Sequence, residues 1–245
     1  CNLTNVPVKQ HSDLIGRILS TGMSKLILQN ITTPVAEWQH TLPFLYVGFD
    51  HAKGSETLSQ YFKTKTNNQG EYGVVLWSPG LISDSRGQSF IDSLSRTSNL
   101  TMSQRYYTQA SRQSAYRSAL NILKHSPQIK FIYACATDVA FGVLDALKET
   151  GKSKTVLVNG WGGGEQELAA IEQGELAVTV MRMNDDNGVA MAEAIKLDLA
   201  GQSKRIPQVY SGDFALVTPD THPMELAQLK AVAFRYSGIP ISVTQ

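Results

Sequence analysis

Six side chains that could bind a ligand stand at or shortly after the points where apolar segments of this sequence end. They supply an amide, two guanidinium groups, a hydroxyl, a carboxylate and an indole: Asn30, Arg86, Thr137, Asp138, Trp161 and Arg182. Guanidinium groups bind oxyanions through paired hydrogen bonds, whereas carboxylates and amides bind hydroxyl groups. An indole can cover the apolar face of a ring. Together these residue types predict a site for a compact, hydroxyl-rich, anionic ligand.

The segments that precede these residues are mostly continuous apolar runs. They are residues 25–31, 44–49, 72–78, 131–136, 155–160 and 176–181. Such runs are typical of parallel strands that are covered on both faces. Amphipathic segments that predict helices lie among them, at residues 111–125, 137–151 and 184–201. This alternation predicts an α/β fold with parallel sheets, in which ligands bind where loops leave the carboxyl ends of the strands.

Trp161 stands in the segment NGWGGG, residues 159–164, and three glycines follow it directly. Two hypotheses account for a large apolar side chain in such a flexible segment. The glycines let the backbone approach a ligand that Trp161 covers, or Trp161 belongs to the core and the glycines permit close packing of a helix on a strand. The spacing does not match the dinucleotide-binding fingerprint, whose third glycine would fall on Glu165.

Structural alternatives also exist for the polar residues. Thr137 or Asp138 could be the N-cap of the helix that Gly151 ends. Arg182 could form a structural ion pair with one of the two aspartates at positions 185 and 186.

The two arginines decide which kind of ligand the site would suit. Arg86 could simply be solvated near the start of a helix, at a cost of only tenths of a kcal/mol, roughly. If Arg86 and Arg182 are both desolvated, they need a negative partner, because an unpaired buried charge is costly. A neutral sugar does not supply that charge.

Composition excludes several functional classes. The formal net charge of +1 and the lack of a Lys/Arg-rich block argue against nucleic acid and anionic membrane surfaces as partners. No apolar run approaches the roughly 18 residues that a membrane-spanning helix needs, so we expect no membrane insertion. The five histidines are scattered, Cys135 lies in an apolar segment, and no G-x-S-x-G motif is present. We therefore expect no metal, no cofactor and no catalysis, and a small buried Cys135.

Several long segments resemble the LuxP-like family of periplasmic autoinducer-2 receptors. They lie between about residues 24 and 237 and include LILQNITTPV, PFLYVGFDH, NGWGGG, VTVMRMNDD, VYSGDF and AFRYS. The resemblance implies a type I periplasmic-binding-protein fold, with two Rossmann-like lobes and a three-segment hinge. The first lobe would hold residues 1–47 and 187–212, and the second 48–186 and 213–245. Because two βα units of the family precede the matching part, the first lobe is expected to be truncated at its N-terminus.

The same resemblance implies a function. Such a receptor binds autoinducer-2, a furanosyl borate diester, in the cleft between its lobes and signals in the periplasm to a LuxQ-like sensor kinase. All six residues named above occupy the family's ligand-binding positions, and boron enters only as part of the ligand. The alternative is a ribose-like sugar-binding protein of an ABC uptake system, which would not require the two arginines.

Overall fold

The computed structural model describes residues 8–22, 25–30 and 45–234, and the chain forms two compact units. Among the described residues, unit 1 comprises 51–181 and 216–221. Unit 2 comprises the described residues of 8–50, together with 182–215 and 222–234. Residues 31 and 44, at the edges of two predicted strands, lie outside the described part. The lobe boundaries implied by the resemblance remain a prediction.

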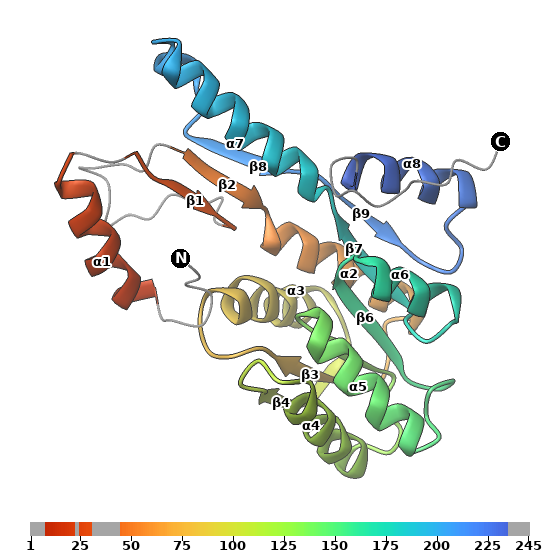
Figure 1. Cartoon of the computed structure of the whole chain (residues 1–245). Coiled ribbons are helices and arrows are strands. Elements are labelled where there is room, and N and C mark those ends of the chain that lie inside the picture. The colour runs from red at the N-terminus through yellow and green to blue at the C-terminus, as the bar shows by residue number, and fades with distance from the viewer. Residues whose placement is uncertain (1–7, 23–24, 31–44, 235–245) are drawn as a thin grey trace. The chain divides into compact units, whose positions relative to one another are not determined.

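Unit 1 is built on a six-stranded sheet in the order β4-β3-β5-β6-β7-β9, of which only residue 182 and residues 214–215 are assigned to unit 2 (Figure 1). The strands are β3 (Glu71–Leu76), β4 (Thr101–Tyr107), β5 (Phe131–Ala134), β6 (Leu157–Gly162), β7 (Val178–Arg182) and β9 (Phe214–Val217). All pairs from β4 to β7 are parallel. The central strands are buried throughout or nearly so, as their apolar sequences predict.

Five α-helices belong to the described part of unit 1. They are α2 (His51–Lys65), α3 (Ser89–Thr97), α4 (Arg112–His125), α5 (Thr137–Glu149) and α6 (Glu165–Glu172). Helix α2 packs beside α3, and α4 packs beside α5. Stacked aromatic rings lie in the core. The centroid of the Phe131 ring is 4.1 Å from the centroid of the Phe62 ring and 5.1 Å from that of the Tyr72 ring. The rings of Phe90 and Tyr133 are 3.9 Å apart.

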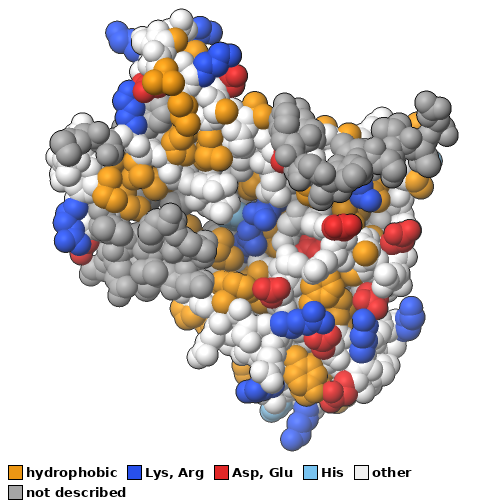
Figure 2. Space-filling model, in the orientation of Figure 1, with side chains coloured by type: hydrophobic (Ala, Val, Ile, Leu, Met, Phe, Trp, Pro, Cys, Tyr) orange, Lys and Arg blue, Asp and Glu red, His pale blue; other side chains and the backbone are white. Residues whose placement is uncertain are grey.

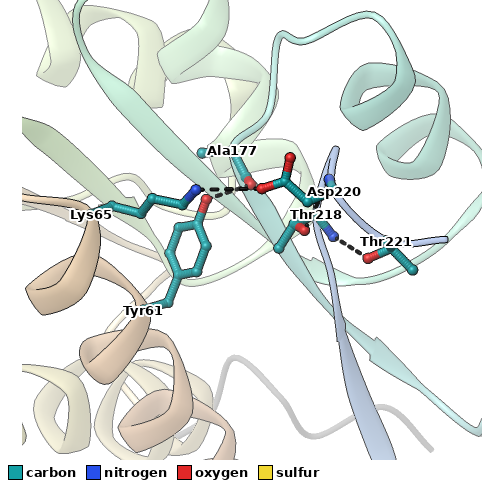
Figure 3. Close-up of polar contacts among 6 residues, drawn as sticks. All are labelled: Tyr61, Lys65, Ala177, Thr218, Asp220 and Thr221. Atoms are coloured by element: carbon teal, nitrogen blue, oxygen red, sulfur yellow. Dashed lines mark hydrogen bonds and ion pairs between the residues drawn. The ribbon is translucent and has the colours of Figure 1, made fainter.

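The segment that follows β9 is attached to helix α2 (Figure 3). Lys65 forms an ion pair with Asp220 at 3.5 Å, and the Tyr61 hydroxyl donates to the Ala177 carbonyl at 2.8 Å. Burial, followed by the nearby charge of Asp220, raises the pKa of Tyr61 to about 12. Because Asp220 is largely exposed, we expect the ion pair itself to contribute at most about 1 kcal/mol.

Unit 2 contains a three-stranded parallel sheet in the order β1-β2-β8. Its strands are β1 (Ile27–Gln29), β2 (Leu45–Phe49) and β8 (Val209–Gly212), and its α-helices are α1 (Val8–Ser20), α7 (Asn184–Leu199) and α8 (Pro223–Ala233). Leu45 and Val47 of β2 pack with Ala194 of α7 in its core. Within the described residues, no helix has the length and apolar character needed to cross a membrane.

All six predicted strands and all three predicted helices form, with ends shifted by a few residues, which confirms the α/β class with parallel sheets. Strands β4, β8 and β9 were not predicted; β4, for example, is a largely exposed edge strand without an apolar run. Arg86 lies in a π-helical segment, Ser83–Gln88, instead of the first turn of an α-helix. Gly151 ends α5 as predicted, with a φ of +67°.

Charged side chains are interspersed over the face of the molecule that Figure 2 shows, with basic and acidic groups close together. Arg112 pairs with Asp145 at 2.7 Å, and Lys148 pairs with Glu175 at 2.7 Å. The Arg112 guanidinium group holds the pKa of Asp145 below its usual value. Among the described residues, the face in Figure 2 shows no extended basic patch, in keeping with the small net charge.

Candidate ligand-binding site

Arg86 enters the candidate site from the π-helical segment that follows β3. Two buried hydroxyl groups hold its main chain: Ser55 Oγ and Tyr133 Oη both donate to the Arg86 carbonyl oxygen, at 2.7 and 3.0 Å. Single π-helical turns occur frequently at functional sites, because they displace one residue from the regular helical register. The π-helical backbone therefore places Arg86 outside the regular α-helical register.

The Arg86 guanidinium group is packed inside unit 1, and only 6% of the residue is exposed. Its Cζ lies 4.5 Å from the centroid of the Trp161 ring, which is the geometry of a cation–π contact. Its Nη1 donates to the Cys135 carbonyl at 3.0 Å, and its Nε donates to His51 Nδ1 at 3.3 Å. Arg86 is thus not a solvated side chain.

Trp161 lies inside strand β6, not in a flexible turn, and is 2% exposed. Its Nε1 donates to the Tyr133 hydroxyl at 2.9 Å, and its ring meets His51 edge-on at 6.1 Å. A Cβ atom on Gly54 would come within 2.5 Å of Trp161 Cη2, so α2 also packs closely on the indole. The geometry favours the hypothesis of a core tryptophan. That Trp161 also covers a ligand stays a prediction.

The glycines around Trp161 allow neighbouring segments to come close to the backbone of β6. A Cβ on Gly160 would lie 2.6 Å from Glu167 Cδ, and a Cβ on Gly163 would lie 2.4 Å from the Met181 Cα. Gly162 and Gly163 have φ angles of +137° and +68°, which disfavour other residues. Gly160, Gly162 and Gly163 are therefore required where β6 passes its neighbours and turns towards α6.

Replacing Gly163 by alanine is expected to lower the free energy of unfolding by about 2–4 kcal/mol, because the new methyl group meets the backbone of Met181 in a left-handed conformation. Urea unfolding of the purified chain measures this. Gly164→Ala is the matched control, since a Cβ there meets no atom within 4 Å and φ is −68°. Its expected cost is under about 1 kcal/mol. Equal stability of both variants would contradict the close-approach interpretation.

Thr137 and Asp138 stand where β5 gives way to α5. The prediction that one of them caps this helix is wrong: the N-cap is Ala136, which makes no side-chain capping bond. The Thr137 hydroxyl instead donates to the Trp161 carbonyl at 3.0 Å, which ties α5 to β6. Asp138 is exposed in the first helical turn, where the helix dipole stabilises a carboxylate.

Burial keeps two further groups of this region protonated. It raises the pKa of the Cys135 thiol to about 11, and the Cys135 sulfur accepts a hydrogen bond from the Trp77 backbone at 2.9 Å. The expectation of a small, buried cysteine is confirmed. Burial also raises the pKa of the Tyr133 hydroxyl, which stays available to donate to the Arg86 carbonyl.

The remaining two predicted residues belong to unit 2. Asn30 follows β1 in the left-handed region, with φ +65°, and its backbone N–H donates to the Val47 carbonyl at 2.8 Å. Asparagine tolerates this conformation better than most residues. Arg182 ends β7, and its Cζ lies 5.3 Å from the Phe49 ring centroid.

Asn187 of unit 2 was not predicted. It lies in the N-terminal part of α7, is 2% exposed, and its Oδ1 has no hydrogen-bond partner within the part of the chain that the structure describes. A Cβ on Gly212 would come within 2.6 Å of that oxygen. A buried amide oxygen without a partner is unusual and marks a candidate acceptor for a ligand hydroxyl.

Unit 1 therefore brings together Arg86, Trp161 and Thr137, with Asp138 next along α5. Sequence reasoning missed the residues that support them, namely Ser55, Tyr133, His51 and Glu167. Of these four residues, Tyr133 could have been noticed in the sequence, because it is the one residue of strand β5 with a polar side chain.

The sequence pattern of the periplasmic binding protein domain matches residues 38–203, more than half of the chain. The chain belongs to this family. Among curated relatives, the D-allose-binding periplasmic protein of Escherichia coli (strain K12) is 33% identical over 99 residues. The ribose import binding protein RbsB of Bacillus subtilis (strain 168) is 25% identical over 173 residues. The alignments cover 40% and 70% of this chain, but only 32% and 55% of those proteins.

Solved structures of periplasmic binding proteins share the fold. An ABC transporter solute binding protein from Agrobacterium vitis, bound with α-D-tagatopyranose, superimposes with a TM-score of 0.79 at 15% identity, covering 89% of this chain and 74% of that one. A periplasmic solute binding protein from Actinobacillus succinogenes 130z with bound D-allose gives 0.78 at 19% identity, covering 89% and 77%. The predicted type I periplasmic-binding-protein fold is thereby confirmed.

Proposed function

We propose that this protein is a non-enzymatic periplasmic solute-binding protein for a hydroxyl-rich, sugar-like ligand, of the kind that serves ABC uptake systems. The observation that carries the proposal is that, in a periplasmic binding protein fold, Thr137 and Asp138 after β5 lie with Arg86 around Trp161 near the carboxyl end of β6. Two relatives whose names include ribose and allose support the sugar class. Binding of this kind requires no cofactor.

In unit 1, each proposed ligand residue has a separate role. The Asp138 carboxylate accepts hydrogen bonds from ligand hydroxyls, and the Thr137 oxygen accepts another while its own hydrogen goes to Trp161. Arg86 donates to a ligand oxygen from an orientation that Trp161 fixes. Trp161 supplies the apolar surface beside the ring.

The same proposal covers three residues of unit 2. The Asn30 amide and the Arg182 guanidinium group stand at strand ends, and the buried Asn187 oxygen accepts a hydroxyl. A ligand hydroxyl that donates to Asn187 Oδ1 would offset the free-energy cost of burying this oxygen without a hydrogen bond.

A second candidate is autoinducer-2 as its furanosyl borate diester, with a LuxQ-like sensor kinase as the signalling partner. The observation in its favour is that each unit holds a guanidinium group against an aromatic ring: Arg86 of the π-helical segment on Trp161, and Arg182 at the end of β7 on Phe49. Stacking through the flat face leaves the N–H edge of a guanidinium group suited to paired bonds with an oxyanion. Boron would enter as part of this ligand only.

Calorimetric titration of the chain with ribose, with allose, and with the autoinducer-2 precursor, each with and without borate, tests both candidates. We expect saturable binding of a sugar that is independent of borate. Binding of the precursor only when borate is present would establish the anionic ligand instead. If none of these compounds produces heat or raises the melting temperature, the proposed function is wrong.

A further inference from the structure

Glu167 of helix α6 is a fully buried carboxylate outside the set of predicted ligand residues. A glutamate in the interior is rare, because removing its charge from water is costly unless hydrogen bonds replace the lost hydration. Its position in the first turns of α6 places it directly behind the glycine-rich end of β6.

Three hydrogen bonds converge on this carboxylate. Oε1 accepts from the backbone N–H of Trp161 at 3.0 Å. Oε2 accepts from the backbone N–H of Gly163 at 2.9 Å and from the Thr179 hydroxyl at 2.5 Å. All three partners are donors, which suits the two carboxylate oxygens because these accept hydrogen bonds.

The glycine at position 160 makes room for this arrangement. A Cβ there would lie 2.6 Å from both Cδ and Oε2 of Glu167 and 2.9 Å from Thr179 Oγ1. The glycine-rich segment and the buried carboxylate are thus parts of one structure, in which the end of β6 is bonded to α6 on one side and to β7 on the other.

Hydrogen bonds connect Glu167 to the proposed ligand residues through Trp161. Glu167 holds the N–H of Trp161, and the carbonyl of the same residue accepts from Thr137. The Trp161 indole in turn lies against the Arg86 guanidinium group. A change at Glu167 would therefore shift Trp161, and with it the start of α5 and the support of Arg86.

We propose that Glu167 is the positioning residue of the ligand-binding site in unit 1, setting the placement of Trp161, Thr137 and Arg86 through the main chain. This inference rests on the proposed function. A glutamine at position 167 has nearly the same shape but places an NH₂ group against one of the backbone N–H donors, so that at least one of these bonds is lost. Ligand affinity should then fall more than fold stability does.

The test compares Glu167→Gln with Glu165→Gln in calorimetric titrations with whichever of ribose, allose or borate-loaded autoinducer-2 precursor the unmodified chain binds. Glu165 is exposed in the first turn of the same helix, so its substitution changes the charge equally without touching β6. We expect Glu167→Gln to raise Kd about tenfold or more at a temperature where it is fully folded. Glu165→Gln should bind with unchanged Kd.

Two further variants keep the test decisive if Glu167→Gln does not fold. Glu167→Asp keeps a carboxylate that is too short to reach all three donors, and should show an intermediate Kd. Thr179→Val removes only the hydroxyl donor and leaves both backbone bonds, so its Kd should stay within about threefold of the unmodified chain. A folded Glu167→Gln or Glu167→Asp variant with unchanged Kd would overturn the positioning role alone. An unmodified chain that binds none of the ligands would overturn the proposed function and this inference together.

Discussion

Replacement of Trp161 by alanine is expected to lower the free energy of unfolding by about 3–5 kcal/mol, as for other buried tryptophans in well-packed cores. The side chain is 2% exposed and is enclosed by Arg86, His51 and helix α2 at Gly54. Removing it would leave a cavity in unit 1 and would strip the Tyr133 hydroxyl of its indole donor. Urea unfolding followed by circular dichroism measures the change.

Trp161→Phe separates the contribution of aromatic packing from that of the indole hydrogen bond to Tyr133. Phenylalanine keeps an aromatic ring beneath Arg86 but cannot donate to Tyr133, so a loss of only about 1–2 kcal/mol is expected. Should Trp161→Ala retain nearly all of its stability while losing ligand affinity, the residue would be a ligand platform and not a core residue. That outcome would reverse the interpretation drawn from its burial.

Replacement of Arg86 by methionine is expected to weaken ligand binding by about 100-fold or more, which corresponds to roughly 3 kcal/mol and is typical for loss of a buried charged hydrogen-bond donor. Methionine preserves much of the apolar stem that packs in unit 1, so the loss reports mainly on the guanidinium group. Arg105→Met is the matched control, because Arg105 lies exposed on the edge strand β4. It should bind like the unmodified chain.

Arg86→Lys then distinguishes the two candidate ligands. Lysine retains the positive charge but not the planar set of donors. For the furanosyl borate diester, part of the affinity should survive and should weaken as salt is added, because the attraction is between opposite charges. For a neutral sugar, lysine and methionine should be about equally poor, without salt dependence. Unchanged affinity in Arg86→Met would show that Arg86 only supports Trp161.

The regular elements were largely predictable, because they depend on local patterns. Residues 131–136 and 155–160 are continuous apolar runs, and both became central strands within two or three residues of the predicted limits. Strand β4 has no such run, since an edge strand needs little burial and forms by pairing with β3. Its formation depends on a neighbour that lies about thirty residues away in sequence.

For the candidate site, the sequence indicated residue types but not their partners. Arg86, Thr137 and Trp161 were singled out individually, and unit 1 does bring them together. Apart from Tyr133, whose polar side chain stands in an apolar strand, their supports were not predictable, because Glu167 gains its role only from the donors that folding places around it. Thr137 shows the same effect: its hydroxyl matched a helix cap locally, but a carbonyl from β6 took that hydrogen bond.

By itself, the sequence determined the α/β class, the strands β1, β2, β3, β5, β6 and β7, the helices α4, α5 and α7, and the side chains near their ends, because apolar periodicity and turn residues act over a few positions. Only the tertiary structure decided that Trp161 is buried in a strand, that the glycines admit Glu167 and Met181, and that Arg86 lies on an indole. These features depend on close contacts between segments distant in sequence, where a single methyl group is enough to prevent the approach.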